Sequence, residues 1–176
     1  MSRIAIFGRQ FSSEYNESIL KFLDILKRKE VEYAIYQTFS SFLEDQLKLA
    51  IEPNRLFTKE SFSPEKFDVI ISIGGDGTML DCTTLVGDSG LPMLGLNTGR
   101  LGFLSSVSID YITEALDQII EGAYMTDQRS LIKLETESRI FGKNNFALNE
   151  MTLHKKDSQS MIVIHAYVDG KFLNTY

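Results

Sequence analysis

The stretch that decides the fold is Phe67-Asp-Val-Ile-Ile-Ser-Ile73, which runs directly into Gly74-Gly-Asp-Gly-Thr78. The first part is apolar and rich in β-branched residues, which is typical of a strand covered on both faces of a parallel sheet. A helical pattern then follows from about Thr78 to Val86. A buried strand that passes through closely spaced glycines into a helix indicates an α/β fold.

The same alternation extends in both directions from this unit. Apolar runs at residues 4–7, 31–36 and 92–96 predict further strands, and apolar periodicity predicts helices at about 14–29, 41–51 and 108–120. Ser41 and Glu44 form a capping-box pattern at the predicted start of the middle helix. We therefore assign residues 1–125 to an α/β domain with a doubly wound, mostly parallel sheet.

The pattern changes after about Ser130. Apolar and polar residues alternate over short segments, and Asp169-Gly170 between two apolar runs is a strong hairpin signal. Five or six short strands are expected. We interpret residues 126–176 as the start of an all-β, sandwich-like domain that is incomplete where the sequence stops at Tyr176.

Composition narrows the classes of function. The chain has 176 residues with 18 basic and 24 acidic side chains, a net charge of −6, which argues against a broad nucleic-acid or membrane-binding face. One cysteine, Cys82, cannot form an internal disulfide, and no zinc-ligand spacing occurs. With His154 and His165 as the two histidines, a Ser-His-Asp hydrolase is disfavoured. A cytoplasmic protein is expected, because no apolar run is long enough for a signal peptide or a membrane span.

The glycine loop has the composition of an anion site. Gly74, Gly75 and Gly77 would let backbone N–H groups approach a phosphate. An aspartate in such a loop is unusual, since Asp76 would repel phosphate unless it meets a metal ion or a hydroxyl. The spacing fits neither the P-loop nor the dinucleotide fingerprint. The alternative is a tight turn in which Asp76 caps the helix.

Two further segments carry candidate ligand contacts. Asn97-Thr-Gly-Arg-Leu-Gly-Phe-Leu104 follows another predicted strand, so it should lie at the same sheet edge as the glycine loop. Phe103 could lie against a flat aromatic ligand, whereas Leu101 and Leu104 are expected in the core. In Ala147-Leu-Asn-Glu150, the pair Asn149 and Glu150 suits the adjacent hydroxyls of a ribose. An exposed hairpin end is the alternative for that pair.

Together these three segments resemble the NAD kinase family. The glycine-aspartate motif alone is shared with diacylglycerol and sphingosine kinases and, loosely, with phosphofructokinases. The three motifs in this order are much more specific, and the resemblance covers essentially the whole chain. The family continues beyond this point with a Thr- and Gly-rich nucleotide segment that does not occur before Tyr176.

The resemblance implies ATP-dependent phosphorylation of the adenosine-ribose 2′-hydroxyl of NAD, which gives NADP. Asp76 would act as the general base and, with Gly77, Phe103, Asn149 and Glu150, would contact NAD. Thr78 would assist the loop glycines in binding phosphate at the helix start. The resemblance also implies nucleotide binding for residues 1–125 and NAD binding for residues 126–176. Mg²⁺ or another divalent cation would accompany ATP and be held mostly by phosphates and water, without a dedicated protein cage. A homodimer or homotetramer is also implied.

Two other functions remain open at this point. The protein could be a lipid or other small-molecule kinase of the same superfamily, which the Leu-Gly-Phe segment and the Asn149–Glu150 pair disfavour. It could also be a non-catalytic nucleotide-binding fragment, since the nucleotide segment of the family is absent. ATP and polyphosphate are not distinguished as donors.

Overall fold

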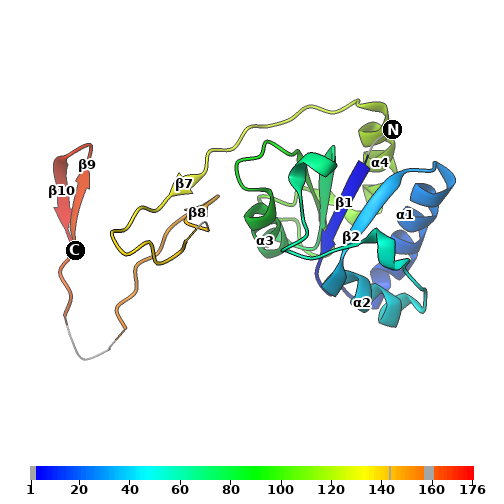
Figure 1. The fold of residues 1–176 in the computed structure, drawn as a ribbon, viewed down its shortest axis with the longest axis horizontal. Helices are drawn as coiled ribbons and strands as arrows, with labels where there is room; N and C mark the ends of the chain where they lie inside the picture. The colour runs from blue at the N-terminus through cyan, green and yellow to red at the C-terminus, as the bar shows by residue number, and fades with distance from the viewer. Residues whose placement is uncertain (1–2, 143, 157–160) are drawn as a thin grey trace.

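A computed structural model describes residues 3–142, 144–156 and 161–176 (Figure 1). Its first part is built on a six-stranded, all-parallel sheet with the order β3-β2-β1-β4-β5-β6. The strands are β1 (Arg3–Gly8), β2 (Glu32–Tyr36), β3 (Leu56–Phe57), β4 (Val69–Ile73), β5 (Met93–Asn97) and β6 (Val107–Ser108). The predicted doubly wound sheet is therefore confirmed.

Helices cover both faces of this sheet. The helices are α1 (Asn16–Arg28), α2 (Gln37–Leu47), α3 (Asp76–Val86) and α4 (Ile112–Glu121), with short 3₁₀ helices at Ser13–Tyr15, Pro53–Arg55, Pro64–Lys66 and Ile109–Tyr111. Helices α1, α2 and α4 contribute to one apolar cluster, and α3 contributes to the other. Figure 1 shows α3 apart from the α1 and α4 pair.

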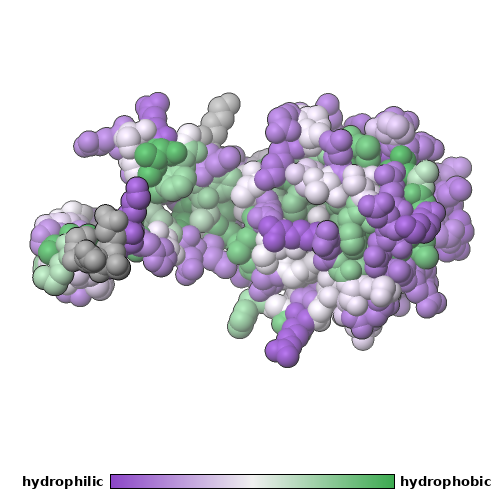
Figure 2. All heavy atoms as spheres, turned by 90° about the horizontal axis from the view of Figure 1, so that it is seen from below, coloured by the Kyte–Doolittle hydropathy of each residue, from purple (hydrophilic) through white to green (hydrophobic). Residues whose placement is uncertain are grey.

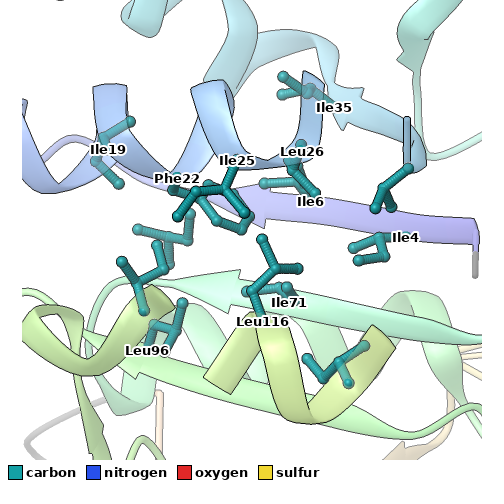
Figure 3. Close-up of a cluster of buried hydrophobic side chains, with 14 of the residues drawn as sticks. Ile4, Ile6, Ile19, Phe22, Ile25, Leu26, Ile35, Ile71, Leu96 and Leu116 are labelled. Carbon is teal, nitrogen blue, oxygen red and sulfur yellow. The ribbon is translucent and has the colours of Figure 1, made fainter. Parts of the chain in front are cut away.

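The two central strands explain why the core has two halves. Successive side chains of a strand point to opposite faces, so Ile4 and Ile6 of β1 pack under α1, while Ala5 and Phe7 pack with the α3 cluster. Strand β4 alternates in the same way. Figure 3 shows the larger cluster, in which α1 and α4 close over the β1 and β4 side chains. The continuous apolar runs of the sequence are thus strands buried on both faces.

Local capping differs from the prediction at α2. This helix begins at Gln37, so Ser41 lies inside it and its hydroxyl donates to the Gln37 carbonyl oxygen at 3.3 Å. Glu44 accepts a hydrogen bond from the backbone N–H of Ile51 at 3.0 Å, beyond the helix end rather than at its start. The capping-box interpretation was wrong because the helix starts directly from the end of β2.

The short edge strands β3 and β6 were not predicted. Each contains two residues, and parallel pairing with β2 and β5 is what defines it. Two residues carry too little periodicity to be recognised without the neighbouring strand.

The last part of the chain forms two separate two-stranded antiparallel sheets. They pair β7 (Ile132–Lys133) with β8 (Phe146–Ala147), and β9 (His165–Val168) with β10 (Lys171–Thr175). The Asp169-Gly170 turn is confirmed, with both residues at positive φ, +49° and +76°. Four strands stand in this described region instead of the five or six expected, because 161–164 and 148–156 have no regular ladder.

This region exposes much of its apolar surface. Figure 2 shows hydrophobic residues on the outside of the C-terminal strands as well as of the α/β part. Phe172 and Leu173 of β10 are 59% and 60% exposed, so the two sheets do not close over a core of their own. A sandwich is therefore absent from the described residues, and the boundary at 125/126 stays a prediction. Within the same residues, no helix combines the length and hydropathy needed to cross a membrane.

Candidate nucleotide site

The glycine loop lies at the carboxyl edge of the sheet, where the strand order changes direction. Strand β1 pairs with β2 on one side and with β4 on the other, so Gly8 at the end of β1 lies beside Ile73 at the end of β4. Open α/β sheets bind ligands outside the carboxyl ends of their strands at such a switch point. The loop from β4 to α3 therefore begins at the position that the fold makes available for a ligand.

Gly74 serves the fold rather than an open ligand surface. Its φ is +150°, and a Cβ placed there would lie 2.3 Å from Oγ1 of Thr78. Its N–H donates to the carbonyl oxygen of Leu96 at 2.9 Å, which ties the loop to β5. Thr78 itself is buried. This N–H is therefore already used within the sheet, and its predicted contact with phosphate has no support here.

The next three residues present their backbone outward. Helix α3 begins at Asp76, two residues earlier than the periodicity indicated, with Gly75 as its N-cap. First-turn N–H groups of a helix have no partner within the helix. A Cβ at Gly75 or Gly77 would meet no atom within 4 Å, and both glycines are exposed. This helix start has room for an anion to approach its N–H groups.

Asp76 joins the two predicted loops. Its Oδ2 accepts the backbone N–H of Phe103 at 2.8 Å, and its Oδ1 accepts those of Leu104 and Ser105, each at 2.9 Å. These donors, that of Ser105 foremost, hold the pKa of the Asp76 carboxyl below its ordinary value. The carboxylate does not cap its own helix, so the alternative of a simple helix cap is wrong.

Gly102 makes this contact possible. A Cβ at Gly102 would lie 2.1 Å from Oδ1 of Asp76 and 2.5 Å from its carboxyl carbon. Any side chain there would displace the carboxylate from the three N–H groups. The absence of a side chain at Gly102 thus lets the carboxylate approach the backbone of the loop closely.

Asn97 organises the loop from its other side, and sequence reasoning gave it no role. Its Oδ1 accepts the N–H of Gly99 at 2.7 Å, while Nδ2 donates to the carbonyl oxygens of Arg100 at 2.7 Å and Ser105 at 3.3 Å. The side chain is 3% exposed. An asparagine that ends a buried strand before a glycine loop was the signal available in the sequence.

This anchored loop presents Phe103 to solvent. The ring is 98% exposed, which fits a platform for a flat ligand better than a core residue. Leu101 is 70% exposed, so its expected place in the core was wrong, because the loop turns outward between its anchors. Leu104 is half-buried.

The predicted ribose pair is not brought to this edge by any described contact. Asn149 and Glu150 follow β8 in irregular backbone, and both are exposed. Among the described residues, no hydrogen bond links either of them to Asp76, whose partners are all in the loop after β5. Their role in binding NAD stays a prediction.

A cavity lies beside the glycine loop and was not foreseen. It has a volume of about 450 Å³ at the ends of β1 and β2 and includes Arg9, Lys59 and Asp81 in its lining. A second cavity, of about 600 Å³, is lined by residues 133–145 of the β7–β8 connection and includes no residue of either glycine loop. The lining of the first cavity also includes no residue of these loops, but it contains Gly8, which pairs with Ile73 directly before the glycine loop. The first cavity is therefore the nearer of the two to the candidate site along the sheet edge.

The remaining titratable candidates lie outside this arrangement. Cys82 is fully buried on α3, and burial raises the pKa of its thiol above the ordinary value. His154 is exposed, and a ring nitrogen of His165 lies 2.8 Å from the hydroxyl of Thr175 in the last hairpin. The described residues contain no cluster of three or more histidine, cysteine or acidic side chains suited to a metal ion.

Comparison with known proteins places this geometry in one family. The model of the ATP-NAD kinase N-terminal domain matches residues 13–124. NAD kinase of Cytophaga hutchinsonii is 40% identical over 172 residues, which is 98% of this chain and 59% of that protein. NAD kinase of Bacteroides fragilis is 35% identical over 174 residues, again 59% of its length.

Two solved structures share the fold. Yeast NADH kinase complexed with NADH superposes with a TM-score of 0.76 at 21% identity, covering 99% of this chain and 55% of that one. An NAD kinase from Archaeoglobus fulgidus in complex with ATP gives a TM-score of 0.63 at 25% identity, covering 98% and 56%. The chain thus spans less than two thirds of the length of these relatives. The family model and the curated relatives agree with each other, and both cover the two loops that Asp76 joins. The chain therefore belongs to the NAD kinase family.

Proposed function

We propose that the full-length protein transfers the terminal phosphoryl group of ATP to the adenosine-ribose 2′-hydroxyl of NAD, which yields NADP. The observation that carries this proposal is the Asp76 carboxylate, held between an open helix start and an exposed aromatic ring. One side of this carboxylate offers N–H groups for phosphate, and the other offers Phe103 for the adenine. Membership of the NAD kinase family names the two substrates.

The hydrogen bonds of Asp76 indicate where the acceptor hydroxyl would bind. A carboxylate has about four lone-pair sites, two on each oxygen. Two sites on Oδ1 and one on Oδ2 are taken by the loop N–H groups, so one site on Oδ2 remains for a substrate hydroxyl. The acceptor proton would pass to this oxygen as the phosphoryl group transfers.

A low pKa does not conflict with this role. Phosphoryl transfer proceeds through a loose transition state in which positioning and charge neutralisation contribute most of the rate, so a strong base is not required. The same three N–H groups that weaken Asp76 as a base also fix its direction. We therefore assign Asp76 both proton acceptance and orientation of the hydroxyl.

The other predicted residues take supporting roles. The N–H groups of Gly75 and Gly77 would contact phosphate oxygens, whereas Gly74 and Thr78 would support the loop from below. Asn149 and Glu150 would hold a ribose of NAD after a change in the position of their segment. Mg²⁺ would be held by phosphate oxygens and water, since the described residues provide no acidic cluster for it.

The setting of the protein belongs to the same proposal. A cytoplasmic location and a homodimer or homotetramer are expected for an enzyme of this family. The net charge of −6 supports the expectation that neither nucleic acid nor a membrane surface is a partner.

The test compares two aspartates that both accept backbone hydrogen bonds at this sheet. Asp76→Asn in the full-length protein should lower NADP formation by 100-fold or more, the order of effect expected for a lost general base. Asp68→Asn is the matched control, since Asp68 accepts the Arg3 N–H at 2.7 Å at the strand start. The assay offers NAD, sphingosine and diacylglycerol with ATP.

The outcomes separate the possibilities clearly. NADP formation by the parent and the control, with loss in Asp76→Asn, supports the proposal. Activity of Asp76→Asn within a few-fold of the parent would remove Asp76 from proton transfer. Phosphorylation of a lipid in place of NAD would move the protein to the alternative kinase class.

A further inference from the structure

The cavity at the ends of β1 and β2 combines aromatic walls with cationic side chains. Its volume is about 450 Å³, and the lining includes Tyr36, Phe39 and Phe42 together with Arg9 and Lys59. Asp81 of α3 is the acidic side chain among the lining residues, so the charged side chains of the lining sum to one positive charge. A cavity of this kind suits an elongated anion better than a neutral apolar ligand.

This cavity is linked to the glycine loop through the end of β1 and through α3, and its lining includes no residue of the loop itself. The backbone N–H of Arg9 donates to the carbonyl oxygen of Ile73 at 3.2 Å, and Ile73 immediately precedes Gly74. The guanidinium of Arg9 pairs with Asp81, one turn into the helix that starts at Asp76. The cavity therefore borders the loop on the β1 side.

The proposed acceptor lies on the other side of the same loop. Asp76 is bonded to the segment after β5, and β5 pairs with β4 on the edge opposite to β1. In phosphoryl transfer the attacking and leaving oxygens lie roughly in line on opposite sides of the phosphorus. An acceptor hydroxyl on the β5 side of the loop thus requires a leaving group on the β1 side.

We propose that this cavity binds the polyphosphate tail of the phosphoryl donor, with Arg9 and Lys59 as ligands of the phosphates that stay on the leaving group. The in-line argument rests on the proposed kinase function, whereas the cavity and its cations do not. Arg9 can hold a phosphate while it is paired, because a guanidinium carries five N–H donors and the pair with Asp81 is made through one of its terminal nitrogens. Asp81 acts here as a positioning residue for that guanidinium.

The experiment measures donor binding without turnover. Calorimetry on the full-length protein titrates ATP, inorganic tripolyphosphate and NAD into the parent and into Arg9→Ala, Lys59→Ala and Arg28→Ala. Arg28 is the matched control, an exposed arginine of α1 that is also paired with one aspartate, Asp24 at 2.7 Å. Thermal unfolding of each variant verifies that the fold is retained.

Arg9→Ala removes a charged hydrogen-bonding partner of the phosphates, so we expect it to bind ATP and tripolyphosphate 10-fold to 100-fold more weakly. Lys59→Ala should show a smaller loss, and binding of NAD should stay within twofold in both variants. The loss should shrink as salt is raised, because the contact is between exposed charges. In turnover, the KM for ATP should rise in Arg9→Ala while the KM for NAD is unchanged.

Comparison of the two anions identifies the donor. Much tighter binding of ATP than of tripolyphosphate, with both sensitive to Arg9, would assign a nucleotide whose base packs on the aromatic wall. Equal binding of the two would assign a linear polyphosphate donor. Either result supports a donor tail in this cavity.

If Arg9→Ala and Lys59→Ala bind ATP and tripolyphosphate with the same affinity as Arg28→Ala, the inference is overturned. It is also overturned if the parent protein binds neither anion. The proposed kinase function fails separately. If the parent forms no NADP but its ATP binding depends on Arg9, the donor site stands without that function. If NADP forms with an unchanged KM for ATP in Arg9→Ala, the function stands without this site.

Discussion

Asn97→Asp tests whether the buried asparagine holds the loop that carries Phe103. The substitution keeps the size and shape of the side chain and retains the oxygen that accepts the Gly99 N–H. It replaces the Nδ2 donor with an oxygen that faces the carbonyl oxygens of Arg100 and Ser105. The perturbation is therefore confined to two hydrogen bonds and one buried charge.

The magnitude follows from those contacts. Two lost hydrogen bonds weaken folding by about 1 kcal/mol each in net terms. Two carbonyl groups left without a partner beside a buried carboxylate add about 1–3 kcal/mol. We expect the free energy of unfolding to fall by about 3–5 kcal/mol at neutral pH, a large share of the stability of a typical domain.

Urea denaturation of Asn97→Asp against the parent measures this loss, with Asn54→Asp as the matched control. Asn54 is exposed in a 3₁₀ helix, so its replacement should change the free energy of unfolding by less than about 0.5 kcal/mol. Burial raises the pKa of the introduced carboxyl in the folded state. Its protonation restores an O–H donor, so the destabilisation should diminish as the pH falls through that raised pKa.

Binding of NAD gives the second readout for the same variant. A loop that has lost its Asn97 anchor presents Phe103 in many orientations, so we expect at least tenfold weaker binding of NAD under conditions where the variant is folded. Stability within 1 kcal/mol of the parent at neutral pH, or unchanged affinity for NAD, would refute the role assigned to Asn97.

Three further predictions concern the glycine loop and α3. Gly74→Ala should unfold at lower urea than Gly75→Ala, because a Cβ at Gly74 collides with Thr78 whereas one at Gly75 meets open space; equal midpoints would contradict this. The folded-state pKa of Asp76 is lowered, so its stabilisation is fully present above the unfolded value of about 3.9 and is lost as the pH falls through the lower folded-state pKa. The free energies of unfolding of the parent and Asp76→Asn, measured with urea, should therefore begin to converge below about pH 4 and meet below the folded-state pKa. The buried Cys82 should react with a thiol reagent no faster than the protein unfolds. Labelling of the native protein that is faster than unfolding would contradict its burial.

Much of the α/β fold could be read from local patterns. The apolar runs that became β1, β2, β4 and β5 are nearly continuous because each of these strands is covered on both faces, and this pattern needs no partner to be recognised. The Asp169-Gly170 turn was equally local, since two successive positive φ angles select these residue types. The glycine-aspartate motif likewise located the start of α3 to within two residues.

The contacts that build the site could not be read in this way. The bonds from Asp76 to the loop after β5 span 27 to 29 residues, and they exist because β4 and β5 are neighbours in the sheet. The cavity with Arg9 and Lys59 also depends on strand pairing. Its lining combines the end of β1 with Asp81 of α3, the helix that follows β4, and β1 and β4 are neighbours in the sheet. Local residue types determine which segments are strands, helices and turns, because those preferences act over a few residues. The pairing order of the strands determines which loops meet, because it joins segments that are distant along the chain.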